Sequence, residues 1–256
     1  MGTYKMNYKI IISTLVRDDE DYLDEWLDYH RDIGVDHFVI YDHKSRRPVL
    51  PRKDVTVYRV DRTDPHNPDV LHNMTLEEVK SEWISLLDVD EFIGLSKHRD
   101  LHSLLKDYRN YGGLAISYLT YGSNGHKTRP EGKVKDNYLM RTPGTYFYNR
   151  TAKCILKCSA VKKIINQHGG YTTLPVVNEK HERWVINQNG KNTHDICRLN
   201  HYYTRSFEEW KRKVDMGNRE RWQVPRNINF IHEIDKNCTI YDPLLYDWDI
   251  HTRGTG

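Results

Sequence analysis

The stretch Trp83-Ile84-Ser85-Leu86-Leu87-Asp88-Val89-Asp90-Glu91-Phe92 places three carboxylates directly after an apolar, strand-like run. Acids buried at the end of a core strand are costly unless a cation or hydrogen bonds compensate them. Residues two apart on an extended backbone point to the same side, so we expect Asp88 and Asp90 to converge on one ion. A divalent metal held there keeps positions open for phosphate oxygens. In the alternative, the acids cap the next turn or face solvent.

The composition is that of a soluble globular chain, because 38% of the 256 residues are hydrophobic and 29% are charged. The formal charge of +3 is small and the basic residues are scattered, which argues against nucleic-acid binding. No apolar run is long enough to span a bilayer and no secretory signal opens the chain, so we expect a soluble, cytoplasmic protein without a transmembrane segment. The four cysteines form no Cys-x-x-Cys pair, which indicates free thiols in a reducing compartment.

The first part of the chain alternates between strand and helix patterns. Strands are predicted over residues 8–16, 37–41 and 55–60, and helices over 20–33 and 70–81, before the strand that ends at Asp88. This alternation is typical of a doubly wound nucleotide-binding half, in which ligands gather at the carboxyl ends of the strands. Arg17, Asp42 and the acidic cluster all fall at such ends.

The rest of the chain is less regular. We expect a helix over residues 100–108, a strand over 113–121 and a polar, glycine-containing loop over 122–132. Ser206-Phe207-Glu208-Glu209 has the form of a capping box and predicts a helix that begins there. With no linker or repeat, residues 1–256 are predicted to form a single domain. Its nucleotide-binding half covers about residues 1–95, its acceptor-binding and metal-completing half about 96–220, and a C-terminal extension 221–256.

Four separated segments, taken in order, resemble a known enzyme family. They are Val16-Arg17-Asp18-Asp19 through His30 with Gly34 through Asp42; Leu87-Asp88-Val89-Asp90-Glu91-Phe92; Tyr121-Gly122-Ser123-Asn124-Gly125-His126 with Arg129-Pro130-Glu131-Gly132; and His201-Tyr202-Tyr203-Thr204-Arg205-Ser206. Over roughly residues 8–215 the chain resembles glycosyltransferase family 92 and family 2-like GT-A glycosyltransferases, with their bacterial and viral relatives. The resemblance implies an α/β GT-A fold, with a Rossmann-like nucleotide-binding half, a mixed central sheet and an irregular acceptor-binding half.

The resemblance also implies a metal-dependent transferase that uses a nucleotide-sugar donor, usually a UDP-sugar. It further implies Mn²⁺ or Mg²⁺ at the donor diphosphate, and a glycan or glycoprotein acceptor. Asp88 and Asp90 match the carboxylates for the metal and the donor ribose, and His201 matches the late metal ligand. Arg17 and Asp42 match positions that hold the nucleobase and ribose. Taken alone, Asp42 could equally cap a turn, and His201 could be a core histidine.

Lys153-Cys154-Ile155-Leu156-Lys157 resembles a Lys-x-Ile-x-Arg run of the family, which implies that Lys153 lies near the donor diphosphate. A cation there stabilises charge on the leaving group, whereas the alternative is a strand with solvated lysines. Two departures from the family pattern concern the sugar and acceptor side. Residues 41–47 are more basic than usual, and Tyr121 and Asn124 stand where Phe and Ser are usual.

The expected reaction is displacement at the anomeric carbon with inversion, in which a carboxylate takes the proton of the acceptor hydroxyl. Asp195, shortly before His201, is the first candidate for that base, and Glu131 and Asp69 remain open. Glycines flank a group of polar side chains that we expect to bind acceptor hydroxyls. These are Ser123, Asn124 and His126.

Two other classes of protein share some of these features. Haloacid-dehalogenase-like phosphatases also have an apolar strand that ends in Asp-x-Asp, but they usually carry Thr or Ser where this chain has Phe92. A carbohydrate-binding module without activity is the third possibility. It predicts sugar binding that does not depend on a metal, whereas the transferase predicts donor binding that chelation abolishes.

Overall fold

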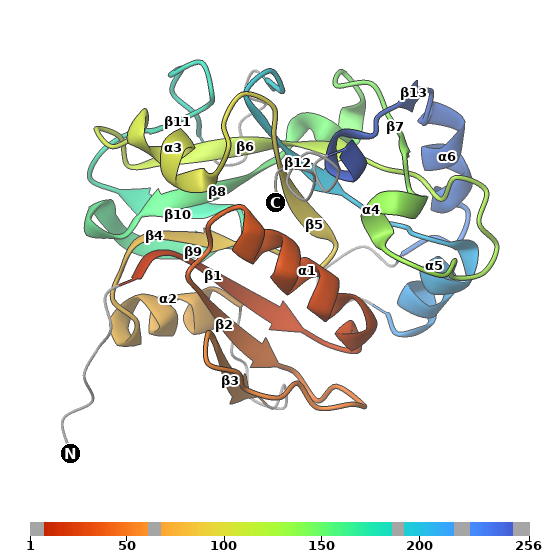
Figure 1. The fold of residues 1–256 in the computed structure, drawn as a ribbon, viewed down its shortest axis with the longest axis horizontal. Helices are drawn as coiled ribbons and strands as arrows, with labels where there is room; N and C mark the ends of the chain where they lie inside the picture. The colour runs from red at the N-terminus through yellow and green to blue at the C-terminus, as the bar shows by residue number, and fades with distance from the viewer. Residues whose placement is uncertain (1–7, 61–67, 186–191, 218–225, 248–256) are drawn as a thin grey trace, which may run out of the picture.

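The computed structural model describes residues 8–60, 68–185, 192–217 and 226–247 (Figure 1). Its strands are β1 Tyr8–Val16, β2 His37–Asp42, β3 Val55–Arg59, β4 Ser81–Leu86, β5 Glu91–Leu95, β6 Gly113–Thr120, β7 Met140–Arg141, β8 Ala152–Lys157, β9 Val161–Asn166, β10 Gly169–Thr172, β11 Val176–Val177, β12 Cys197–His201 and β13 Ile240–Tyr241. Its helices are α1 Glu20–Asp32, α2 Pro68–Glu78, α3 Leu101–Lys106, α4 Val134–Asn137, α5 Phe207–Asp215 and α6 Phe230–Asn237, with short 3₁₀ helices η1 Phe147–Arg150 and η2 Cys158–Ala160.

A mixed sheet with the order β3-β2-β1-β4-β8-β6-β12-β5 forms the centre of the molecule. The first four strands are parallel, in the 3-2-1-4 order of a Rossmann-like nucleotide-binding half. Strand β8 runs antiparallel to β4 and β6, and β12 is parallel to β6 but antiparallel to β5. This topology confirms the predicted α/β fold of the GT-A class, with a mixed central sheet.

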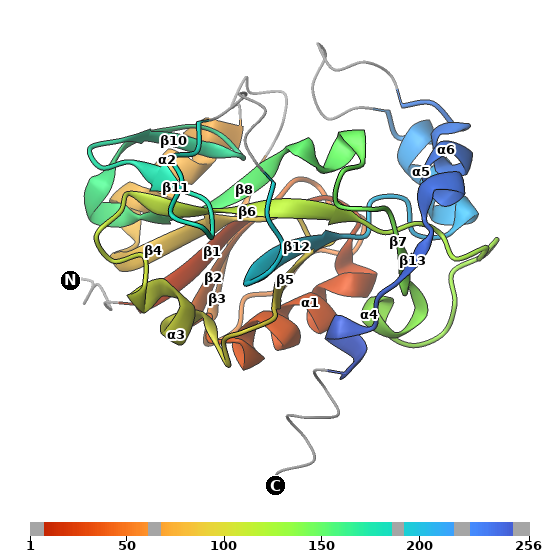
Figure 2. The same cartoon turned by 90° about the horizontal axis from the view of Figure 1, so that it is seen from above.

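Helices cover both faces of the parallel strands (Figures 1 and 2). Alternate residues of β1 point to opposite faces, so Ile10 packs in the core that contains Trp26 of α1, while Ile11 packs in a second core. On that second side, Leu71 of α2 packs on Val39 of β2 and its neighbours. Burial on both faces explains why β1 and β2 are continuously apolar in the sequence and do not alternate with polar residues.

Most predicted elements agree with the structure, including the strand over residues 8–16 and the helix that the Ser206–Glu209 capping box begins. Gly34 follows α1 with a φ of +103°, where a Cβ atom would lie 2.9 Å from the His102 ring. The predicted helix over 70–81 is displaced, because α2 ends at Glu78 and residue 81 already pairs with β1 in the sheet. Within the described residues, no helix is long and apolar enough to cross a membrane.

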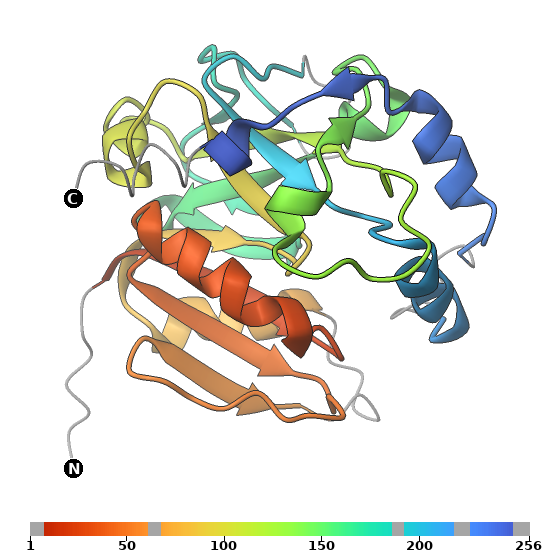
Figure 3. The same cartoon turned by 45° about the vertical axis from the view of Figure 1, so that its right-hand side comes forward.

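Strand register brings the late part of the chain to the acidic stretch. In the antiparallel pair of β5 and β12, His201 lies opposite Glu91, and the Tyr202 backbone N–H donates to the Asp90 carbonyl oxygen at 2.8 Å. In the parallel pair of β6 and β12, His201 lies opposite Thr120. Figure 3 shows β12 and β5 side by side above the parallel strands. These pairings hold His201 beside the turn that carries Asp88 and Asp90.

The centre of the sheet gives a prediction about stability. Ile84 on β4 is fully buried and pairs with both β1 and β8, so Ile84→Ala removes packing on a strand that joins the parallel and antiparallel parts. We expect the free energy of unfolding in a urea titration to fall by about 2–5 kcal/mol. Leu50→Ala, at a side chain that is 70% exposed, is the control and should change it by less than about 0.5 kcal/mol. A loss at Ile84 no larger than that of the control would contradict this packing.

Candidate active site

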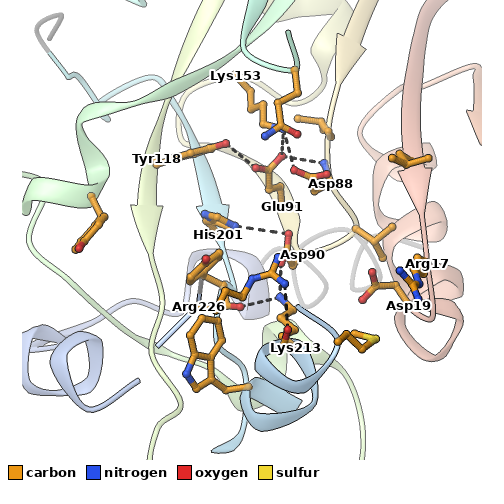
Figure 4. Close-up of a pocket in the computed structure, with 18 of the residues that line it drawn as sticks. Arg17, Asp19, Asp88, Asp90, Glu91, Tyr118, Lys153, His201, Lys213 and Arg226 are labelled. Carbon is orange, nitrogen blue, oxygen red and sulfur yellow. Dashed lines mark hydrogen bonds and ion pairs between the residues drawn. The ribbon is translucent and has the colours of Figure 1, made fainter. Parts of the chain in front are cut away.

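A pocket of about 680 Å³ opens where the strands β1 and β4 end. It is lined by Arg17 after β1, by the turn between β4 and β5, by Tyr118 of β6, Lys153 of β8 and His201 of β12, and by residues of α5 and α6. Figure 4 shows these side chains pointing toward one another from separate elements. Ligands of doubly wound sheets bind at the carboxyl ends of the strands, and this pocket has that position.

Asp90 lies at the centre of the pocket between two basic side chains (Figure 4). Its Oδ1 lies 3.6 Å from Nε2 of His201, and its Oδ2 accepts a hydrogen bond of 2.6 Å from Nζ of Lys213 on α5. Burial alone would raise the pKa of this carboxyl, but Lys213 and His201 together hold the pKa well below its usual range. Asp90 is therefore an anion at neutral pH, with one oxygen directed at His201.

Asp88 belongs to a second, more deeply buried network. Nζ of Lys153 lies 3.0 Å from Oδ2 of Asp88 and 3.2 Å from Oε2 of Glu91, while the Tyr118 hydroxyl donates to Oε1 of Glu91 at 2.6 Å. Burial raises the pKa of Glu91, and the charge of Lys153 opposes that rise. Burial also favours the neutral form of Lys153, yet its two carboxylate partners raise its pKa above the usual value. The ammonium of Lys153 thus compensates two acids that the fold buries.

The extended geometry expected between Asp88 and Asp90 is wrong. The Glu91 N–H donates to the Asp88 carbonyl oxygen at 3.0 Å, which closes a turn over residues 88–91. The Glu91 carboxylate in turn accepts from the Asp88 N–H at 2.9 Å. In a turn the alternation of side chains no longer applies, so Asp88 meets Lys153 whereas Asp90 meets His201 and Lys213.

A metal ion in this pocket could be bound by two protein side chains among the described residues, Asp90 and His201. Within the described ranges, no group of three or more His, Cys, Asp or Glu side chains has the geometry of a metal cluster. Oδ1 of Asp90 and Nε2 of His201, however, are close enough to contact one ion together. Mg²⁺ and Mn²⁺ are often bound through one or two protein ligands, with waters and substrate phosphates completing the shell. The residues present fit a dication for which the protein supplies only part of the coordination shell.

Among the described residues, five basic side chains line the same pocket beside five carboxylates, and they are the groups that could contact a diphosphate. They are Arg17, Lys153, Arg212, Lys213 and Arg226. His72 and His168 do not add to this positive charge at neutral pH, because burial and the nearby Lys153 lower the pKa of both to about 4. The pocket therefore presents guanidinium and ammonium groups on more than one side of Asp90.

The two residues predicted to bind the nucleotide lie in different surroundings. Arg17 lines the pocket. Asp42 is fully buried, and its carboxylate accepts hydrogen bonds of 3.0 Å from the backbone N–H groups of Ser45 and Val49 and one of 2.5 Å from Arg59. This arrangement matches the turn-capping alternative for Asp42, and its role toward a nucleotide stays a prediction.

The residues predicted to bind the acceptor or to act as the base are not among the described residues that line this pocket. Ser123 donates through its hydroxyl to Asp235 at 2.5 Å, while Asn124 and His126 are hydrogen-bonded to the Asn137 carbonyl oxygen. Those three side chains order the loop after β6, and their acceptor role stays a prediction.

Asp195, the first candidate for the base, lies in a different setting. Its side chain is 64% exposed and lies 3.2 Å from Nζ of Lys180 at the surface. The alternatives Glu131 and Asp69 also lie outside the lining of the pocket. The structure brings none of these three carboxylates to Asp90 and His201.

Sequence reasoning missed three residues that the structure brings to the site: Lys213, Glu91 and Tyr118. Lys213 could have been found from the predicted helix, because it lies three residues after the buried Trp210 and so on the same helical face. Glu91 belongs to the acidic stretch of the sequence, but only the folded turn brings it to the same lysine, Lys153, as Asp88. Tyr118 carries no signal in the sequence.

The fold is of the GT-A class, and comparison with known proteins gives the family. The model of glycosyltransferase family 92 matches residues 48–231, so the chain belongs to glycosyltransferase family 92. Among curated relatives, a family 92 protein of Ricinus communis is 25% identical over 222 residues, which cover 80% of this chain and 37% of that protein. A family 92 protein of Oryza sativa subsp. japonica is 26% identical over 145 residues, covering 52% of this chain and 25% of that protein.

The chain thus spans between a quarter and just over a third of the length of these two relatives. Similar solved structures include Staphylococcus aureus TarS, residues 1–349, in complex with UDP, with 13% identity, a TM-score of 0.34 and coverage of 59% of this chain and 47% of that chain. HddC from Yersinia pseudotuberculosis shows 9% identity, a TM-score of 0.38 and coverage of 67% and 90%. Similarities this weak carry no conclusion about the present chain.

The network around Lys153 gives a second prediction. Lys153→Met leaves Asp88 and Glu91 without their shared cation, and Glu91 is almost fully buried. We expect the free energy of unfolding at pH 7, from a urea titration, to fall by about 3–5 kcal/mol. Adding Glu91→Gln should recover part of this loss, since the deepest unpaired charge is then removed.

Lys180→Met is the matched control, because Lys180 forms its ion pair with Asp195 at the surface, where both side chains are more than half exposed. Its effect should be below about 1 kcal/mol. Equal losses for Lys153→Met and Lys180→Met would mean that the buried pair is not needed to compensate the acids.

Proposed function

We propose that this chain transfers a sugar from a nucleotide-sugar donor, a UDP-sugar, to a hydroxyl of a glycan or glycoprotein acceptor, with inversion at the anomeric carbon and with Mn²⁺ or Mg²⁺ as cofactor. The observation that carries the proposal is the 3.6 Å approach of Asp90 Oδ1 to His201 Nε2, across a pocket at the carboxyl ends of the parallel strands. These two residues stand 111 positions apart, and nothing but the fold brings them together. Membership of glycosyltransferase family 92 supports the reaction class.

Asp90 and His201 are the residues that would hold the ion. A bound dication would neutralise charge on the donor diphosphate and on the departing nucleoside diphosphate. Lys213 keeps Asp90 ionised and supplies a further positive charge in the same pocket. Lys153 holds Asp88 at the edge of the pocket, where the family resemblance implies contact with the donor ribose.

The cations of the pocket also favour departure of the leaving group. Charge on the diphosphate grows as the bond to the anomeric carbon breaks, and preorganised cations stabilise that growing charge more than the ground state. Arg17, Arg212 and Arg226 line the same pocket as Asp90. The fold already holds these guanidinium groups in place, so they need not reorganise as bulk water would. The acceptor hydroxyl loses its proton to a carboxylate as it attacks.

Replacement of Asp90 tests the proposal directly. Asp90→Asn keeps the shape of the side chain but removes the charge that faces His201, so UDP release from a panel of UDP-sugars with Mn²⁺ should fall by on the order of 10²-fold or more. Asp215→Asn is the control, since Asp215 lies on the same helix as Lys213 but pairs with Lys211 at the surface. Wild-type turnover by a folded Asp90→Asn protein would exclude the proposed role of Asp90.

Removal of metal is the second test. EDTA should abolish UDP release, and added Mn²⁺ or Mg²⁺ should restore it. In His201→Ala the restoring concentration should rise on the order of tenfold or more, because one of two protein ligands is lost. Release of inorganic phosphate in place of UDP would indicate a phosphatase. Sugar binding without turnover, unchanged by EDTA, would indicate a binding module.

A further inference from the structure

Exposed aromatic rings gather at one rim of the pocket. Phe147 and Tyr148 of η1 are 63% and 44% exposed, and the Tyr148 ring meets the Phe230 ring of α6 at a centroid distance of 4.8 Å in a T-shaped contact. Tyr148 and Phe230 both line the pocket. We call these three residues the aromatic shelf. Large apolar rings left open beside a polar pocket are typical of a surface that receives a ligand.

The aromatic shelf is continuous with the centre of the pocket. The ring of His201 lies 5.1 Å from that of Tyr203, and the Tyr203 ring lies 5.9 Å from that of Phe230. Two successive ring contacts, His201 with Tyr203 and Tyr203 with Phe230, therefore connect the proposed metal ligand to the aromatic shelf. A ligand on the shelf therefore lies beside the reacting centre and not at a remote surface.

The same rim carries a carboxylate that differs from the others in the pocket. Asp88 and Glu91 share Lys153, Asp90 pairs with Lys213, and Asp19 pairs with Arg205. Glu233 is exposed and lines the pocket, and within the described part of the chain it has no cationic partner. Its Oε1 accepts a hydrogen bond from the Tyr146 hydroxyl at 3.5 Å.

Glu233 also lies on the same side of its helix as the shelf. It follows Phe230 by three residues on α6, so the two side chains share one helical face. A carboxylate without a bound cation is the kind that can take a proton, because no ion pair must break first.

The nucleotide has its place on the opposite side. Arg17 and His72 line the pocket from β1 and α2, beside the parallel strands where nucleotides bind in such sheets. In both Figure 1 and Figure 2, α6 lies on the other side of the molecule from β2 and β3. If the nucleotide binds at the parallel strands and the donor sugar lies near Asp90, the aromatic shelf is the part of the pocket that remains available to the acceptor.

We propose that the aromatic shelf and Glu233 form the acceptor site, which binds the terminal pyranose ring of a glycan. This inference rests on the proposed transferase function. A sugar ring stacks its C–H face on Tyr148 and Phe230, while its hydroxyls need polar partners such as Glu233. In the reaction the acceptor oxygen bonds to the anomeric carbon and the bond from that carbon to the diphosphate breaks. The bonding electrons leave with the nucleoside diphosphate, and Glu233 takes the acceptor proton.

Tyr148→Ala tests the shelf with a panel of methyl glycosides (glucoside, galactoside, mannoside and N-acetylglucosaminide) as probes. In the presence of UDP and Mg²⁺, which is diamagnetic, saturation-transfer NMR should show ring-proton contacts with the wild type, and Tyr148→Ala should weaken them on the order of tenfold. Tyr171→Ala is the matched control, because Tyr171 on β10 is likewise exposed, at 63% against 44% for Tyr148, but does not line the pocket. Affinity for UDP, measured by calorimetry, should be the same in all three proteins.

Three results would exclude the aromatic shelf as the acceptor site. One is a fall in UDP affinity in Tyr148→Ala, since the rings would then stack on the nucleobase. The second is the absence of sugar contacts in the wild type, and the third is their survival in Tyr148→Ala. Failure of the transferase proposal looks different, because the wild type would then bind sugars through Tyr148 but neither bind UDP with Mn²⁺ nor release it from a donor.

Glu233→Gln tests the proton transfer separately. Release of UDP from a UDP-sugar, with the best methyl glycoside of the panel as acceptor, should fall about 10²–10⁴-fold. UDP affinity should stay at its wild-type value, and the sugar contacts in NMR should persist because the Gln amide still hydrogen-bonds sugar hydroxyls. A merely structural role of Glu233 would not predict a loss of turnover with binding retained. A variant with wild-type turnover and an unchanged pH profile would exclude Glu233 as the base.

Discussion

The pairing of β12 with β5 and β6 is the constraint on which the site depends. It sets His201 opposite Glu91 and beside the turn that carries Asp90, although these residues are far apart in the sequence. A shift of one residue in this register would turn His201 to the other face of the sheet. The parallel strands alone could offer a nucleotide a place to bind, but β8, β12 and α5 bring Lys153, His201 and Lys213 to the acids.

Compensation of buried charge is the second requirement of this arrangement. Three carboxylates lie in one turn at a strand end, and each has a cation: Lys153 for Asp88 and Glu91, and Lys213 for Asp90. Removing one partner of such a pair is strongly destabilising, whereas the complete set is not. The same ammonium groups that make the acidic turn tolerable also line the pocket in which we propose that the donor diphosphate binds. Stability and function therefore draw on the same residues.

Much of the fold could be predicted from the sequence, because continuous apolar runs, apolar residues at helical spacing and a capping box each indicate local secondary structure. The side-chain geometry of the acidic stretch could not, since a turn and an extended strand fit Asp88-Val89-Asp90 equally well until Glu91 closes the turn. Asp42 illustrates the same limit: its place at a strand end was right, but its partners are backbone groups of the next loop. The helical face that Lys213 shares with Trp210 could be predicted, but the approach of α5 and α6 to the acidic turn could not, because no local pattern encodes it.

The central claim is that a dication sits between Asp90 and His201 and contacts the donor diphosphate. Crystals grown with UDP and Mn²⁺, measured at the manganese absorption edge, test it most directly. The account predicts one anomalous peak within bonding distance of Asp90 Oδ1, His201 Nε2 and the diphosphate oxygens. UDP bound in the pocket with no manganese peak between these two residues, or with the peak elsewhere, would contradict it.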